Sequence, residues 1–111
     1  MKMHDLHGTV EQDQIGKKLR EYASSGESEF KILTGYGSTS GKCQSKATAL
    51  RVLGKMKREG LIKAYLPAEK CKAVLWTTDS FYETKQQYQK RLASDRDAQI
   101  GNDGVIFVFV K

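Results

Sequence analysis

The stretch FKILTGYGSTSGK, from Phe30 to Lys42, predicts the architecture around it. It begins as a short buried strand, stops at a pair of glycines and passes through a small polar loop into a helix. Glycines among hydroxyl residues let the backbone adopt positive φ angles and bring N–H groups close to a ligand. The helix that follows adds its own N-terminal donors and the positive end of its dipole. This junction therefore predicts a site for an anion.

Strand-like and helix-like segments alternate along the rest of the chain. Predicted strands span residues 2–7, 29–34, 61–66 and 104–110, and predicted helices span 10–23 and 44–59, with a third helix capped by Asp79 or Ser80. The last strand is almost continuously apolar, which is typical of a central strand. Residues 73–76 fit either a strand or an apolar loop that closes one side of the core, and 94–101 fit a loop. The order predicts one α/β domain over residues 1–111, with helices packed on a mostly parallel or mixed sheet.

The composition favours a polyanionic partner. The chain has 19 Lys and Arg against 13 Asp and Glu, a net charge of +6, and such a balance is typical of proteins that bind nucleic acid. A basic solubilising surface is the alternative. The two cysteines, Cys43 and Cys71, match no metal or redox spacing and are expected to be reduced thiols. Because no apolar run resembles a signal peptide or a membrane span, we expect a cytoplasmic protein with no membrane partner.

The glycine loop does not match the common nucleotide-binding motifs. A P-loop needs glycine five residues before Gly41 and Ser or Thr after Lys42, but the chain has Tyr36 and Cys43 there. The dinucleotide fingerprint is not met either. These mismatches argue against a nucleotide kinase or ATPase, and against a small-molecule phosphotransferase or hydrolase.

Asp5 and His7 lie two residues apart on the first predicted strand, so their side chains project from the same face. If the first two strands are parallel neighbours, this pair and the glycine loop share the edge where open α/β sheets bind ligands. Histidine beside a carboxylate is suited to general acid–base catalysis near neutral pH. The alternative is a hydrogen-bonded pair that stabilises a strand end. His4 faces the other way and is expected to be structural or exposed.

Read together, these residues resemble the Smr, or small MutS-related, domain family. Asp5-Leu6-His7-Gly8 is similar to its first motif and Thr34-Gly35-Tyr36-Gly37 to its second, although Thr34 stands where many members have histidine. The resemblance continues through Leu66-Pro67-Ala68-Glu69 and Asn102-Asp103-Gly104-Val105, and it covers nearly the whole chain, as in stand-alone bacterial members.

The resemblance implies a two-layer α/β sandwich similar to the C-terminal domain of a bacterial translation initiation factor. It also implies binding to DNA or RNA, with nicking or RNA-cleaving endonuclease activity, in DNA repair or at ribosomes. His7 would transfer the proton and Asp5 would orient its ring. The nucleic-acid-binding residues would be Thr34, Gly35, Tyr36, Gly37, Ser38, Lys42, Lys46 and Arg51, with the loop N–H groups on the scissile phosphate, the cations on flanking phosphates and Tyr36 stacked on a base. A non-catalytic nucleic-acid- or ribosome-binding module is the alternative.

Carboxylates late in the chain suggest one candidate cofactor. Asp95, Asp97 and Asp103 lie near the last predicted loop, and together with Asp5 they could bind Mg²⁺ through hard oxygen ligands. Charged loop residues with no ligand role are the alternative. The oligomeric state leaves no mark in the sequence.

Overall fold

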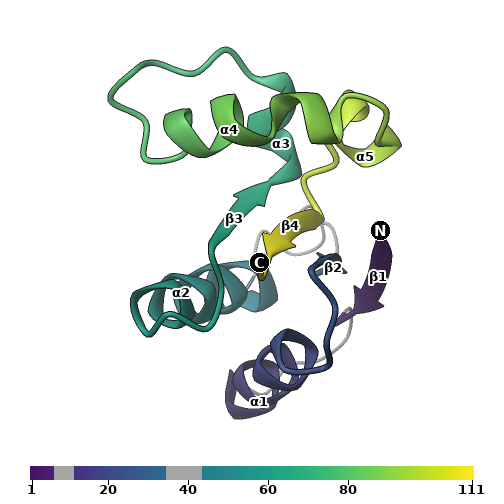
Figure 1. Cartoon of the computed structure of the whole chain (residues 1–111), viewed down its shortest axis with the longest axis vertical. Helices are drawn as coiled ribbons and strands as arrows, with labels where there is room; N and C mark the ends of the chain where they lie inside the picture. Colours follow the sequence, from purple (N-terminus) through teal and green to yellow (C-terminus); the bar gives the residue numbers. More distant parts are fainter. Residues whose placement is uncertain (7–11, 35–43) are drawn as a thin grey trace.

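The computed structural model describes residues 1–6, 12–34 and 44–111. In these ranges the elements follow the order β1 (Lys2–Asp5), α1 (Gln12–Ala23), β2 (Glu29–Leu33), α2 (Gln44–Arg58), β3 (Ala64–Pro67), α3 (Ala68–Lys72), α4 (Tyr82–Leu92), α5 (Arg96–Ile100) and β4 (Val105–Phe109). Figure 1 shows the sheet between two groups of helices, with α1 and α2 on one side and α3, α4 and α5 on the other.

The four strands form one mixed sheet in the order β1-β2-β4-β3. Strands β1 and β2 are parallel neighbours, whereas β4 pairs antiparallel with both β2 and β3. Every residue of β4 is buried, as expected from its near-continuous apolar sequence. The predictions of an α/β fold with a mixed sheet and a central last strand are therefore confirmed.

Helices α1 and α2 cover one face of the sheet. Their apolar stripes, which include Ile15 and Leu19 of α1 and Leu53 and Met56 of α2, are buried against residues of β2 and β4. This helical layer on the sheet is the two-layer core that was expected.

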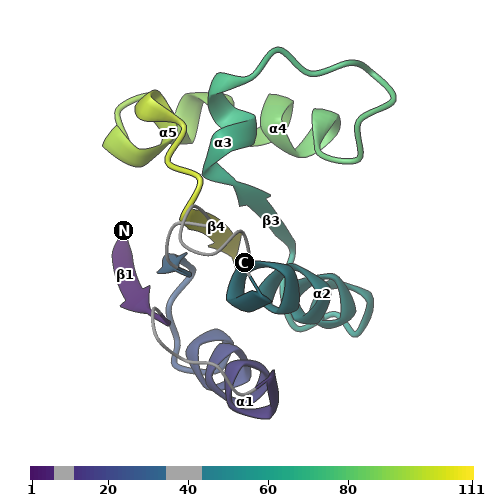
Figure 2. The ribbon, with the colours of Figure 1, turned by 180° about the vertical axis from the view of Figure 1, so that it is seen from behind.

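The other face carries a second apolar cluster under the three shorter helices. Phe107 and Phe109 of β4 are buried there, and the ring of Phe109 stacks on Tyr88 of α4 at a centroid distance of 3.7 Å. Over β1 this face is more open, and Met3 remains exposed. Figure 2 shows β1 at the margin of the molecule, away from α4.

The third strand begins later than predicted, at Ala64 instead of residue 61. Helix α2 ends at Arg58, one residue before its predicted end, and Gly60 follows in a Schellman cap: Leu61 N donates to Met56 O (3.0 Å) and Gly60 N to Lys57 O (3.1 Å). Leu61 therefore completes the helix cap. The predicted strand ended at residue 66, whereas Pro67 is the last residue of β3, a position that an edge strand tolerates.

Two expectations for residues 68–103 are wrong. Residues 73–76 form no strand and close no part of the core, because Val74 and Trp76 are 96% and 83% exposed. Residues 94–101 contain α5, whose first turn is capped by Asp95 and whose end is closed by Gly101 in the left-handed conformation. The predicted third helix is confirmed as α4, but its predicted cap is wrong, because the N-cap residue is Phe81 and no side chain caps the helix. Asp79 instead accepts a hydrogen bond from the N–H of Phe81 (2.8 Å) in the turn before the helix.

Candidate functional site

The carboxyl ends of β1 and β2 lie side by side, as required for the predicted site. Asp5 pairs with Leu33 in the parallel register, and the N–H of Leu6 donates to the carbonyl of Leu33 (2.8 Å). The Asp5 side chain is exposed at this edge. His7, Gly35, Tyr36, Gly37, Ser38 and Lys42 lie outside the described residues. Of the residues predicted for catalysis, the structure therefore describes only Asp5, which lies beside the carboxyl ends of β1 and β2.

Thr34 directly follows β2, but its side chain is buried. Its hydroxyl and its N–H both donate to the carbonyl of Gly104, at 3.1 and 2.7 Å. These bonds fasten the end of β2 to the start of β4. Thr34 was predicted to bind nucleic acid, but its hydroxyl is oriented toward the neighbouring strand and away from solvent.

His4 has a structural environment, as predicted. Its ring stacks on Tyr22 at a centroid distance of 3.9 Å, and Nε2 lies 2.8 Å from Oε2 of Glu27. The hydrogen bond with His4 lowers the pKa of the Glu27 carboxyl, which keeps this partner ionised and the ring fixed. His4 therefore joins β1 to the loop that precedes β2.

A groove between α1 and α2 gathers cations of the described chain. We call it the basic groove; it has a volume of about 590 Å³ and is lined by Asp13, Gly16, Lys17, Arg20, Thr48, Arg51, Val52, Lys55 and Arg58. Five of these side chains are cationic and one is a carboxylate. The helices approach closely at Gly16, where an added Cβ would lie 3.9 Å from Cγ2 of Val52. This surface is suited to a polyanion.

The cations of the basic groove repel one another, and some of them have compensating contacts in the described structure. Arg20 forms an ion pair with Glu59, with 2.8 Å between Nη1 and Oε1, but the two side chains are 39% and 41% exposed, and a pair so accessible to water contributes little stability. Cations in the last turn of α2, including Lys55 and Arg58, also interact favourably with the helix dipole. An anionic ligand would relieve the repulsion of the whole set.

Only Arg51 of the basic groove was predicted as a binding residue. A usable signal was present, because Arg51, Lys55 and Arg58 are spaced four and three residues apart and so share one helix face. Lys17 and Arg20 repeat the spacing on α1. That these two charged helix faces lie next to each other could not be predicted, since this depends on how α1 and α2 pack.

The predicted phosphate contact Lys46 is already in an ion pair. Its ammonium group bonds to a carboxylate oxygen of Glu69, and the lysine side chain is only 14% exposed. This pair ties the first turns of α2 to α3. A phosphate would have to displace Glu69 to reach Lys46.

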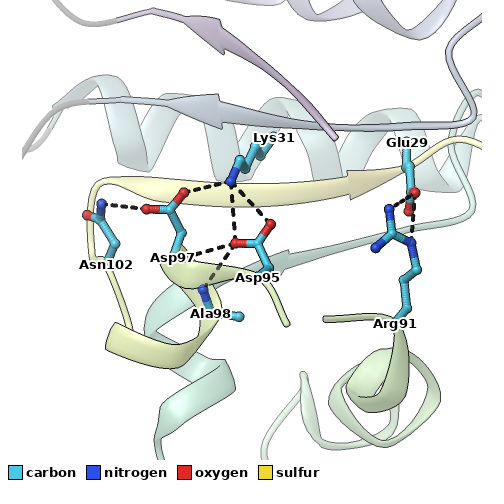
Figure 3. Close-up of polar contacts among 7 residues, drawn as sticks. All are labelled: Glu29, Lys31, Arg91, Asp95, Asp97, Ala98 and Asn102. Carbon is cyan, nitrogen blue, oxygen red and sulfur yellow. Dashed lines mark hydrogen bonds and ion pairs between the residues drawn. The ribbon is translucent and has the colours of Figure 1, made fainter. Parts of the chain in front are cut away.

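The carboxylates proposed as a magnesium site are organised around a lysine. Lys31 Nζ lies 2.7 Å from Oδ2 of Asp97 and 3.2 Å from Oδ2 of Asp95, and Asn102 donates to Asp97 Oδ1 (3.1 Å). Figure 3 shows Lys31 directed from β2 between the two carboxylates. Burial raises the pKa of Asp97, but the hydrogen bonds from Lys31 and Asn102 outweigh it, and the net pKa is lowered. The ion pairs of Lys31 with Asp95 and Asp97 therefore attach α5 to β2 of the sheet.

Among the described residues, no group of three His, Cys, Asp or Glu side chains is arranged to hold a metal ion. Within the same ranges, no helix combines the length and apolar character needed to cross a membrane.

Comparisons with protein-family models, curated proteins and solved structures find no match to this chain.

Proposed function

We propose that this chain is a nucleic-acid-binding domain and that the basic groove holds the phosphate backbone. The observation that carries the proposal is the set of five cations on two packed helices, in a chain whose net charge is +6. Phosphates neutralised by such a surface release counterions, which drives binding without base contacts. The ligand class includes DNA, RNA and ribosomal RNA. The proposal also places the protein in the cytoplasm, where a free thiol such as that of Cys71 stays reduced.

Binding of labelled oligonucleotides to the full chain, measured by fluorescence anisotropy, tests this proposal. The double variant Arg51→Gln/Lys55→Gln removes two cations from the basic groove. At about 0.1 M salt, the removal of one phosphate-binding cation should weaken binding roughly five- to eightfold, so the loss of both should weaken it roughly 25- to 60-fold. The matched control is Lys90→Gln/Arg96→Gln, which removes the same charge from exposed positions on α4 and α5. Equally weakened binding in the two double variants would show that net charge acts without a site.

Phosphodiester cleavage is the second part of the proposal, and the parallel β1–β2 pair favours it. The pair places the exposed Asp5 at the edge where open α/β sheets bind ligands, and His7 follows two residues later in the chain. His7 would take a proton from water or a ribose 2′-hydroxyl, and Asp5 would orient the imidazole. Backbone N–H groups of Gly35–Ser38 would stabilise the charge that develops on the phosphate.

The two histidines of the chain allow a matched test of cleavage. In single-turnover assays on saturating RNA or DNA, His7→Ala should slow cleavage about 10²–10⁴-fold without weakening binding. Asp5→Asn should have a smaller effect on the rate, because an amide still orients the ring. His4→Gln preserves a hydrogen bond to Glu27 and should keep the rate within a few-fold. Binding without cleavage of any substrate by the wild-type chain would leave a non-catalytic binding module.

A further inference from the structure

A second groove continues the basic groove across the far side of α2. We call it the aromatic groove; it has a volume of about 390 Å³ and is lined by Gly54, Lys57, Arg58, Tyr65, Ser80, Phe81 and Thr84. Arg58 lines both grooves, so the two are adjacent. The aromatic groove differs in chemistry, since it combines two cations with the partly exposed rings of Tyr65 and Phe81.

The rings of this groove are held in place. Those of Tyr65 and Phe81 meet edge to face, with centroids 5.5 Å apart and planes at 80°. Gly54 makes room for the Tyr65 side chain, because an added Cβ would lie 3.2 Å from the Tyr65 hydroxyl and 3.7 Å from Nη1 of Arg58. Glycine inside a helix lowers the stability of the helix relative to alanine. The close approach of Tyr65 and Arg58 to α2 therefore comes at a loss of helix stability.

The loop between α3 and α4 leads directly into the aromatic groove and presents an exposed indole. Trp76 is 83% exposed, although large aromatic side chains usually gain stability by burial. The loop is braced: Asp79 N donates to Trp76 O (2.9 Å), and Lys70 forms an ion pair with Asp79 (3.0 Å). Figures 1 and 2 both show this loop projecting away from the sheet beyond α4. The indole is thus presented to solvent from an anchored turn.

We propose that the aromatic groove and Trp76 form a subsite for the unpaired bases of a single strand. This inference rests on the proposed function and narrows its ligand from any nucleic acid to an unpaired strand. Phosphates lie along the basic groove and pass Arg58, and the bases beyond it stack on Trp76 and on the rings of Tyr65 and Phe81. Every base presents a π face, so such stacking tolerates sequence, and the adjoining cations bind the backbone. A duplex keeps its bases stacked internally and gains nothing here.

The chain carries its own reporter, because Trp76 is its only tryptophan. Two single strands of about 12 nucleotides are compared: one with bases, and one abasic with the same number of phosphates. The strand with bases should quench Trp76 fluorescence and bind at least fivefold more tightly. Trp76→Ala should weaken binding of that strand about 5–150-fold, the fold-change equivalent to 1–3 kcal/mol per stacked base, and leave the abasic strand unchanged.

Val74→Ala is the matched control, since it shortens an apolar side chain of the same loop that is even more exposed than Trp76. It should stay within twofold of wild type, and Trp76→Phe should recover most of the wild-type affinity. Equal affinity for the two strands with unchanged tryptophan fluorescence would overturn the base subsite. In that case, weaker binding of both strands by Arg51→Gln/Lys55→Gln would still support phosphate binding in the basic groove. Trp76 would then be assigned to contact with a protein partner. If neither strand binds at all, the proposed function fails as well.

Discussion

Replacing Lys31 with methionine should destabilise the fold by about 2–3 kcal/mol. The side chains of Lys31, Asp95 and Asp97 are only 14%, 13% and 17% exposed. Removal of one partner from a fully buried ion pair costs about 3–5 kcal/mol, because the remaining charge is left in a poor environment. Two carboxylates would remain here, but residual contact with water relieves part of the penalty. Methionine preserves the apolar stem, so the destabilisation reports the ammonium group.

The assay is urea unfolding at pH 7 followed by circular dichroism. With a slope of about 1.5 kcal/mol per M, typical for a domain of this size, the midpoint should fall by about 1–2 M. Lys90→Met is the control, since Lys90 is an exposed lysine of α4 and methionine has a similar helix propensity. Its midpoint should move by less than about 0.3 M, in line with the small effect of surface substitutions.

The pH dependence of the stability difference between wild type and Lys31→Met tests whether the ion pairs with Asp95 and Asp97 cause it. The folded pKa of Asp97 is held below its usual 3.8, so the pair contributes fully above about pH 4, and its contribution is lost as the pH falls through the folded pKa. Burial would lower the pKa of Lys31, but its hydrogen bonds with Asp97 and Asp95 raise it above 10.5, so the contribution persists to that pH. The gap between wild type and Lys31→Met should therefore narrow toward pH 3. A gap below 0.5 kcal/mol at pH 7, or one as large at pH 3, would refute the reasoning.

Three further predictions concern glycines and a thiol. Gly16→Ala should stabilise the protein by about 0.5–1 kcal/mol in urea unfolding, because the methyl group meets Val52 at ordinary contact distance and helix propensity improves; a loss of stability would contradict this. Gly101→Ala should destabilise by more than about 1 kcal/mol, since its φ is +65° and an added Cβ would lie 3.0 Å from Cβ of Lys72; an unchanged midpoint would show that the turn relaxes. Burial raises the pKa of the Cys71 thiol to about 11, so iodoacetamide at pH 8 should modify this residue in urea but barely in the native protein, as read by peptide mass spectrometry, and rapid native labelling would indicate an open thiol.

The sequence was sufficient for the core of the fold because its main elements carry strong local patterns. The apolar run that contains Val105–Phe109 predicted a central strand. The second predicted helix, over residues 44–59, is followed by Gly60, a residue type that is typical directly after a helix. Helix α5 was missed because it spans only five residues, and its cap, Asp95, is equally typical of a polar loop. The apolar residues at positions 73–76 suggested a core segment. Their burial depends on whether another element packs against them in the tertiary structure, and Val74 and Trp76 remain exposed.

The candidate site shows the same division. The predicted site depended on the first two strands being parallel neighbours, and β1 and β2 meet that condition. Ion pairs such as Lys46–Glu69 and Lys31–Asp97 were not predicted, because their partners lie far apart in the chain. The basic groove depends on helix packing in the same way. Charge spacing on each helix is visible in sequence, whereas the meeting of two charged faces is not.

The most direct test of the basic groove is the salt dependence of single-strand binding. If all five groove cations contact phosphates, the slope of log affinity against log salt should be about −3.5, from roughly 0.7 per contact on a single strand. In Arg51→Gln/Lys55→Gln the slope should become shallower by about 1.4. In Lys90→Gln/Arg96→Gln it should stay unchanged. A slope near zero in wild type, or equal slopes in wild type and the groove variant, would contradict nucleic-acid binding through the basic groove.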